Sequence, residues 1–457
     1  GGKMDTQNSG FNIYERHDFD CECGRHHKMP IGEVVIDSGA ARKLPYYVKA
    51  LELGKKGILV TDEVIFGSIG REIYAYWQEQ GLEIECYVLK GHIRPDEHTV
   101  GNVVCNTPFD ADYIVSLGGG TVTDVVRYVA TRLKLECVSI PSAMTMDGFF
   151  TNMSIIIVDG LQVTYYLNYP SLLLADSDII AKAPSVMNAA GVGEVISKIS
   201  AGMDWYAGKL IKDIYYCDRV EAMMGECIAE GAADETIEGI VPGEKKAIEN
   251  LTDALYKSAV AMAWYDSSPC GSGAEHQLNH FWIKCQDEKG VPQSMHGQEV
   301  GVGAVINTMI WEEIMAIDFE RFDVEKAVEK TWDRGEWEKE IRAVYGEGAE
   351  SILELQAENH SFDKAVRRNE IEKIIEHREA LAKRFEAMPS SGALIEKLKK
   401  AGAPWHPKQL QIDKDELVKS LYFAKETRSG RYNALWLAEA LGIMEDVSSK
   451  IIKKLEF

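Results

Sequence analysis

The sequence predicts an α/β nucleotide-binding domain with a parallel sheet, followed by an all-α domain. Between about residues 31 and 183, short β-branched runs alternate with amphipathic segments, and such alternation favours a parallel sheet covered on both faces. In this part a run of three glycines stands between an apolar strand and a helix. From residue 184 onward the chain consists mainly of long helical stretches with few candidate strands.

Five segments of the N-terminal part are expected to form strands: GEVVID, KGILVTDE, IECYVLK, ADYIVSLGGG and ECVSIPS. The segments around WQEQ and TDVVRYVATRL are expected to be helices between them. We therefore expect a tail at residues 1–30, an α/β domain at 31–183 and a helical domain at 184–457. Residues 312–395 are rich in Glu, Lys, Arg and Ala, which indicates exposed amphipathic helices.

Composition limits the class of protein. The chain is 46% hydrophobic and 27% charged, as is typical of a soluble globular protein. Its formal charge of −22 argues against nucleic-acid binding, which needs a concentrated positive surface. No stretch approaches about 20 apolar residues, the length of a membrane span, and the N-terminus lacks the apolar core of a signal peptide. We expect a cytoplasmic protein that holds any anionic substrate in a local site.

The nine cysteines are scattered, which suits buried thiols in a reducing compartment better than a disulfide framework. The segment CECGRHH places Cys21, Cys23, His26 and His27 within seven residues. Four soft ligands are compatible with a metal ion, but tetrahedral sites usually draw their ligands from two separated turns. The role of this segment therefore stays open.

The three glycines, Gly118, Gly119 and Gly120, are followed by Thr121 and Thr123 in the first turn of the expected helix. Glycines at this position let backbone N–H groups approach a phosphate, and the helix N-terminus adds favourable partial positive charge. A plain tight turn is the alternative interpretation.

Asp62 ends the KGILVTDE strand. An acidic residue at a strand end accepts hydrogen bonds from the ribose hydroxyls of adenosine and repels a 2′-phosphate, which favours NAD over NADP. Asp is also a good helix N-cap, so NADP stays possible.

Three loci in the helical half suggest a catalytic metal. GSGAEHQLNHFW places His276 and His280 on one helix face. SMHGQEVGVG supplies His296, and AAGVGEVISK supplies Glu194. A catalytic divalent metal usually takes three protein ligands and leaves one position open for substrate. We therefore expect a site made of one carboxylate and two histidines.

The order of several motifs makes a resemblance visible. The chain resembles the sn-glycerol-1-phosphate dehydrogenases, a branch of the iron-containing alcohol dehydrogenase and dehydroquinate synthase superfamily, over about residues 30–310 and again from about 397. The motifs are GGGTVTDVVR, SIPSAMTMDGFFT, LLLADSDIIAKAP, AGVGEVISK, GSGAEHQLNHFW, MHGQEVGVG and RSGRYNALWLAEALG. The resemblance implies a dehydroquinate synthase-like fold, an active site in the cleft between the two domains and at least a dimer.

By motif position, the resemblance implies that Glu194, His276 and His296 are the metal ligands, and that His280 lies near the substrate and nicotinamide. A set of two histidines and a carboxylate suits Zn²⁺ or Ni²⁺, with Fe²⁺ also possible.

The resemblance also implies a cofactor site and two further substrate contacts. The expected cofactor-binding residues are Asp62, Gly118, Gly119, Gly120, Thr121, Asp124, Ser142 and Thr145. Asp147 matches the aspartate that holds a substrate hydroxyl. Lys198 lies one helical turn after Glu194, so it either reaches a substrate oxygen or phosphate or pairs with an acidic neighbour.

Two positions depart from the pattern of the dehydrogenase branch. Glu194 stands where that branch has Asp, as in the synthase branch, and Arg127 stands where the wider superfamily commonly has Lys. However, FFTNMSIII lacks the lysine that the synthases carry after the aspartate.

The expected function is reversible, NADH-dependent reduction of dihydroxyacetone phosphate to sn-glycerol 1-phosphate, with the metal polarising the ketone. His280 is expected to deliver the proton, for which an ordinary pKa near 6.5 is suited. The alternatives are a dehydroquinate synthase-like cyclase, a glycerol or other alcohol dehydrogenase without phosphate specificity, and a non-catalytic NAD-binding sensor.

Overall fold

The computed structural model describes residues 18–158, 161–358, 360–428 and 430–457. The first 17 residues of the expected tail therefore lie outside the described residues. The chain forms two compact units, residues up to 191 with 229–264, and residues 192–228 with 265–457. The expected boundary at 183/184 is a single cut, whereas these units interleave along the chain.

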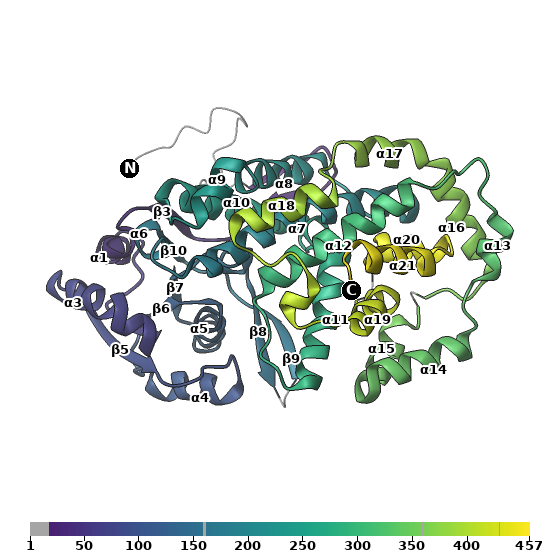
Figure 1. Cartoon of the computed structure of the whole chain (residues 1–457). Coiled ribbons are helices and arrows are strands. Elements are labelled where there is room, and N and C mark those ends of the chain that lie inside the picture. Colours follow the sequence, from purple (N-terminus) through teal and green to yellow (C-terminus); the bar gives the residue numbers. More distant parts are fainter. Residues whose placement is uncertain (1–17, 159–160, 359, 429) are drawn as a thin grey trace. The chain divides into compact units, whose positions relative to one another are not determined.

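Unit 1 contains a six-stranded sheet in the order β3-β10-β7-β6-β4-β5, with every pair parallel (Figure 1). The strands are β3 (Glu33–Asp37), β4 (Lys56–Asp62), β5 (Glu83–Leu89), β6 (Tyr113–Gly118), β7 (Glu136–Pro141) and β10 (Leu172–Asp176). The five expected strands and the parallel sheet are confirmed. The sixth strand, β10, was not predicted; its sequence LLLAD is buried throughout, as in a parallel strand covered on both faces.

Neighbouring strand residues pack on opposite faces of this sheet, as the two-residue repeat of a strand requires. Leu59 belongs to a core with Trp77, whereas Ile58 and Val60 belong to a second core with Val125. Helices therefore cover both faces.

The helices of unit 1 are α1 (Leu44–Ala50), α2 (Glu63–Ile65), α3 (Arg71–Glu79), α4 (Glu97–Asn106), α5 (Gly120–Leu133), α6 (Ser177–Ile180), α9 (Asp234–Ile240) and α10 (Lys245–Tyr265, of which the last residue falls in unit 2). Two antiparallel hairpins complete the unit, β1 (Asp18–Asp20) with β2 (His26–Lys28) and β8 (Met153–Val158) with β9 (Leu161–Tyr166). Neither hairpin was predicted.

Within the described residues, unit 2 is helical. Two helices, α7 (Ser185–Lys212) and α8 (Asp218–Gly231), continue from one unit into the other. The others are α11 (Ala274–Lys289), α12 (His296–Met315), α13 (Val324–Glu329), α14 (Arg334–Tyr345), α15 (Ala349–Gln356), α16 (Lys364–Glu376), α17 (Arg378–Glu386), α18 (Ser391–Ala401), α19 (Lys414–Phe423), α20 (Ala434–Ala440) and α21 (Met444–Lys454). None of the described helices is long and apolar enough to cross a membrane.

The charged region at 312–395 has the amphipathic helices that its composition indicates. Its helices bury a few large side chains, among them Trp337 in α14 and Ile371 in α16. Charged residues cover the other faces, as in the exposed ion pair between Arg368 and Glu325. This region adds a packed helical layer to unit 2.

Candidate metal and nucleotide sites

Three residues far apart in the sequence meet in unit 2. Glu194 comes from α7, His276 from the first turn of α11, and His296 is the first residue of α12. Their potential ligand atoms all lie within 4.8 Å of one another. His276 Nε2 is 3.7 Å from Glu194 Oε1, and His296 Nε2 is 3.3 Å from Glu194 Oε2. We call these three residues the carboxylate–histidine cluster.

Glycines bring two helices close enough to form this cluster. A Cβ atom added at Gly193 would lie 2.1 Å from the Gly297 carbonyl oxygen, and one added at Gly301 would lie 2.9 Å from the Gly193 Cα. The backbones of α7 and α12 therefore touch where the ligands project. This contact explains the glycines at positions 193 and 301 of the motifs AGVGE and HGQEVG.

Glu194 is buried and strongly paired. Its carboxylate accepts a hydrogen bond from Lys198 Nζ at 2.5 Å, and the same ammonium donates to the Gly271 carbonyl at 3.2 Å. Burial alone would raise the pKa of Glu194, but the charges of Lys198 and His296 hold this pKa well below its usual range. The carboxylate is therefore ionised, and the acidic-partner interpretation of Lys198 describes the contact that it makes.

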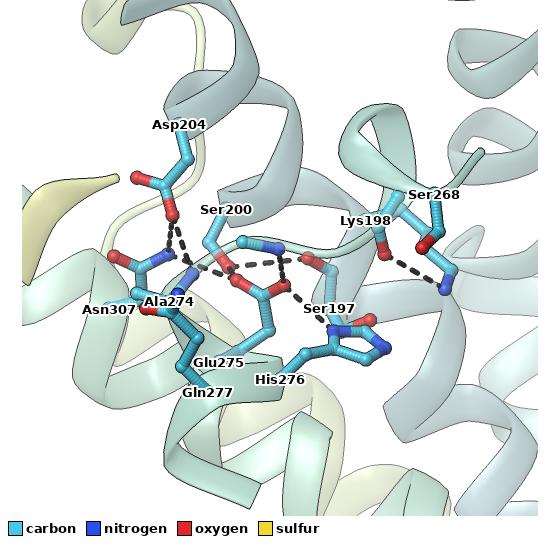
Figure 2. Close-up of polar contacts among 12 residues, drawn as sticks. Ser197, Lys198, Ser200, Asp204, Ser268, Ala274, Glu275, His276, Gln277 and Asn307 are labelled. Carbon is cyan, nitrogen blue, oxygen red and sulfur yellow. Dashed lines mark hydrogen bonds and ion pairs between the residues drawn. The ribbon is translucent and has the colours of Figure 1, made fainter. Parts of the chain in front are cut away.

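The ring of His276 is oriented by the preceding residue. Its Nδ1 lies 2.9 Å from Glu275 Oε1. A carboxylate only accepts, so Nδ1 donates, and in the neutral ring Nε2 is then the nitrogen with a lone pair for a metal ion. Glu275 is fixed in turn by Ser200 Oγ at 2.9 Å and Asn307 Nδ2 at 3.1 Å, and Figure 2 shows its carboxylate between these groups.

Asp204 extends this network. It accepts hydrogen bonds from the backbone N–H of Ala274 at 2.8 Å, from Asn307 and from the Trp311 indole. Burial, followed by the nearby charge of Glu275, raises the pKa of Asp204 to about 7. Sequence reasoning missed both carboxylates, because contacts such as Ser200 with Glu275 and Asn307 with Asp204 join positions that lie far apart in the chain.

The cluster fits a divalent metal ion. It supplies one carboxylate and two imidazoles, a donor set that suits a catalytic metal with an open position. Glu194 Oε2 has no hydrogen-bond partner among the described residues, so a buried anionic oxygen is left for a cation. The side chains of Glu194, His276 and His296 are 0%, 12% and 35% exposed, which leaves the group reachable from the His296 side.

His280 lies one turn after His276 on α11. Burial, followed by the positive charge of Arg428, holds the pKa of His280 well below its ordinary value. The ordinary pKa near 6.5 expected for His280 from the sequence is therefore wrong, and the ring stays neutral at pH 7.

The glycine run lies at the carboxyl end of the sheet in unit 1. Gly118 ends β6, Gly119 is the N-cap of α5 and Gly120 is its first residue. Apart from its two chain neighbours, none of the described residues has an atom within 4 Å of a Cβ built on Gly119, so its backbone borders open space. Ser142 follows β7 and donates its backbone N–H to the Gly118 carbonyl at 2.9 Å. Carboxyl ends of parallel strands are where nucleotides bind in such sheets.

The acidic cofactor candidates make internal contacts. Asp62 accepts the backbone N–H groups of Val64 and Ile65, each at 2.9 Å, so the N-cap alternative is realised. Asp124 lies 4.0 Å from the Arg127 guanidinium, and burial raises its pKa to about 6 although Arg127 opposes this.

The remaining candidates of unit 1 lie after β7 or at the start of α5. Asp147 opens a short 3-10 helix and accepts a hydrogen bond from Ser258 Oγ at 2.7 Å. Arg127 donates to the carbonyl groups of Gly148 and Phe149, each at 3.0 Å, and so fixes the segment after Asp147. Thr145 and Thr121 are partly exposed.

Comparisons with known proteins agree with this architecture. The family described as iron-containing alcohol dehydrogenase matches residues 35–184. A glycerol-1-phosphate dehydrogenase [NAD(P)+] of Geobacillus thermodenitrificans is 27% identical over 93% of this chain and 96% of its own. The Bacillus subtilis protein of the same name is 30% identical over 64% of this chain and 74% of its own. The chain belongs to the glycerol-1-phosphate dehydrogenase family.

Solved structures place this family member in a known fold. A probable glycerol dehydrogenase from Sinorhizobium meliloti matches with a TM-score of 0.60 at 16% identity, covering 93% of this chain and 98% of that one. Glycerol dehydrogenase from Schizosaccharomyces pombe matches with a TM-score of 0.59 at 15% identity, covering 93% and 91%. These likenesses establish the fold of the glycerol-1-phosphate dehydrogenase family member.

Proposed function

We propose that the protein is a metal-dependent NAD(P)H oxidoreductase that interconverts dihydroxyacetone phosphate and sn-glycerol 1-phosphate. The carboxylate–histidine cluster carries this proposal, because it combines a catalytic donor set with an oriented imidazole in a member of this family. We further propose NAD as the preferred cofactor, bound along Gly118, Gly119 and Gly120, and a dimer as the working assembly.

Each ligand has a defined task. Glu194, His276 and His296 would hold one divalent ion, Zn²⁺, Ni²⁺ or Fe²⁺, which supplies Lewis-acid polarisation of the substrate carbonyl. Lys198 keeps Glu194 ionised and offsets part of its charge in a buried place. Glu275 keeps the Nε2 lone pair of His276 directed at the site. His296, at the exposed side, faces the incoming substrate.

The proton reaches the product oxygen through His280 in this mechanism. A neutral imidazole has one N–H donor and one acceptor nitrogen, so His280 can pass a proton on while taking another from water. Because its pKa is held low, His280 does not store the proton as an imidazolium ion. Asp147 of unit 1 would accept a hydrogen bond from a substrate hydroxyl.

Positive charge near His280 favours a phosphorylated substrate over glycerol. Arg428 and Arg431 both lower the pKa of His280 through their charges, and Arg431 also donates to Ser268 Oγ at 2.9 Å. Guanidinium groups bind phosphate oxygens with strong, directional hydrogen bonds. In a chain with net charge −22, such a local pair is what would hold an anionic substrate.

The test is NADH and NADPH oxidation by chelator-treated protein reloaded separately with Zn²⁺, Ni²⁺, Fe²⁺ and Mn²⁺. Dihydroxyacetone phosphate and dihydroxyacetone serve as parallel substrates. We expect turnover that requires both a metal and the phosphate. Silence with every metal, in protein shown to bind NADH, would contradict the proposal, and equal rates with both ketones would contradict its phosphate specificity.

A further inference from the structure

The CECGRHH segment forms a tight turn between two short strands of unit 1. Strands β1 and β2 pair antiparallel, and the connecting turn is closed by Cys21 N–H to the Arg25 carbonyl and Gly24 N–H to the Cys21 carbonyl, each at 3.0 Å. Gly24 has φ 84°, a left-handed conformation that glycine adopts without strain. The turn brings Cys21 and Cys23 toward His27.

Three of the four candidate ligands converge. The ligand atoms of Cys21, Cys23 and His27 lie within 4.8 Å of one another, and Cys23 Sγ is 3.3 Å from His27 Nε2. In a tetrahedral zinc site with bonds of about 2.3 Å to sulfur and about 2.0 Å to nitrogen, a sulfur and a nitrogen ligand are about 3.5 Å apart. The side chains therefore need little movement to bind an ion.

The tautomer of His27 suits a ligand. Its Nδ1 lies 2.6 Å from the carbonyl oxygen of Trp264, and because a carbonyl only accepts, Nδ1 carries the hydrogen. Nε2 then presents its lone pair toward Cys23. Histidine ligands of metals commonly donate their other ring N–H to a carbonyl or carboxylate, which fixes the ring. The ring is fully buried and packs against Phe19 and Trp264 at centroid distances of 5.4 and 6.1 Å.

His26 is placed differently. Successive residues of a strand point to opposite faces, and His26 is the exposed neighbour of buried His27 in β2. Its Nδ1 lies 2.9 Å from Asp20 Oδ1, and its Nε2 pairs with Asp18. Hydrogen bonds to Asp20 and Asp18 raise the pKa of His26. His26 therefore belongs to a surface ion pair and makes a matched control.

We propose that Cys21, Cys23 and His27, the thiol–histidine cluster, bind a structural Zn²⁺ ion. The ion would close the β1–β2 hairpin, and His27 would join the hairpin to α10 through its hydrogen bond to the Trp264 carbonyl. Two thiolates and an imidazole are a donor set that zinc prefers, and zinc adds no redox chemistry. Three ligands leave one tetrahedral position for a fourth donor. This proposal does not depend on the proposed function, because it uses none of the carboxylate–histidine residues.

The first experiment is metal analysis of the full-length protein after dialysis against a weak chelator. We expect Cys21→Ser, Cys23→Ser and His27→Ala each to lose about one zinc per chain relative to wild type, whereas His26→Ala loses none. Far-UV circular dichroism checks the fold of each variant. A Cys21→Ser/Cys23→Ser double variant that retains the full zinc content would overturn the proposal.

A cobalt titration tests directly whether the thiolates bind the metal, because zinc could also be lost from a variant in which the hairpin has simply unfolded. Co²⁺ added to the zinc-stripped protein should give the near-ultraviolet charge-transfer absorption of a thiolate-bound cobalt ion. This band should survive His296→Ala and disappear in the double cysteine variant. Cys23→His, which keeps a ligand, should restore zinc binding with a weaker cobalt band. If the wild-type protein binds Co²⁺ without this band, the proposal is overturned, and the contact between Cys23 and His27 is a hydrogen bond and not part of a metal site. Cys→Ser substitution of each remaining cysteine under the same titration identifies the fourth donor.

Discussion

The carboxylate–histidine cluster and the thiol–histidine cluster differ in how the chain assembles them. The first draws one donor from each of three helices and depends on the packing of α7 against α12. The second takes all its named donors from one hairpin of a few residues. The first also includes a histidine whose side chain is 35% exposed, whereas the imidazole of the second is fully buried. A mixed set with an exposed histidine suits catalysis, and a buried, sulfur-rich set suits a structural ion.

His296→Ala separates the two clusters most sharply. Loss of a metal ligand should reduce turnover by more than about 100-fold, the upper range for residues that only support a ligand. The unfolding temperature and the zinc content of the thiol–histidine cluster should stay near their wild-type values, because His296 is at the partly exposed start of α12. The measurement is NADH oxidation in samples of known metal content. Unchanged turnover would remove His296 from the site.

Glu275→Gln should weaken metal binding at the carboxylate–histidine cluster by about 10- to 100-fold, because an uncharged amide oxygen is a weaker acceptor than the carboxylate that orients His276. Competition with a chelating dye measures this affinity. Glu299→Gln is the matched control: burial raises the pKa of Glu299 to about 8, so its side chain is already neutral at pH 7. Equal affinities in the two variants would contradict an orienting role for Glu275.

Gly193→Ala tests the helix contact behind the first cluster. The new methyl group would meet the Gly297 carbonyl, and such overpacking typically costs about 1–3 kcal/mol. In α8, Gly225 is exposed with no atom within 4 Å of an added Cβ, so Gly225→Ala should stabilise by about 0.5–1 kcal/mol. Denaturant unfolding compares the two. A stable Gly193→Ala protein with normal metal affinity would show that the contact is not needed.

The pH dependence of stability gives an effect that develops gradually over several pH units. Because the pKa of Glu299 rises from 4.5 to about 8 on folding, its contribution is complete below pH 4.5 and is lost as pH rises toward 8. The loss is at most about 1.4 kcal/mol per pH unit. Glu299→Gln should remove this slope, so the variant gains stability over wild type between pH 6 and 8. Parallel unfolding curves at all pH values would contradict this sign.

The part of the fold that local patterns determine could be predicted. Each of the five expected strands is a short apolar run bounded by turn residues, and β10 was missed because LLLAD lies inside a motif that was interpreted by resemblance alone. The hairpin β8–β9 was missed because MSIIIV has no alternation. Both errors concern short apolar runs, which periodicity does not resolve.

The site residues also fall into those that could be predicted from the sequence and those that could not. Motifs and resemblance nominated Glu194, His276 and His296, and the structure brings these three together. Glu275 adjoins His276 in the chain, but its contact with Ser200 and the contact of Asp204 with Asn307 arise only from tertiary packing. The low pKa of His280 arises from burial. The separation of His26 from His27 was within reach of sequence reasoning, because neighbours in a strand face opposite sides.

The glycine contact between α7 and α12 fixes the distance between the two helices that carry Glu194 and His296. With no side chains between the two backbones, the distance from helix to helix is at its minimum and cannot shrink to suit a different ligand. Glu194 in place of Asp therefore extends the reach of the carboxylate by about one C–C bond while the helix backbones stay where they are. Because the helices cannot move to compensate, the length of the acidic side chain at position 194 determines which ion size the cluster fits best.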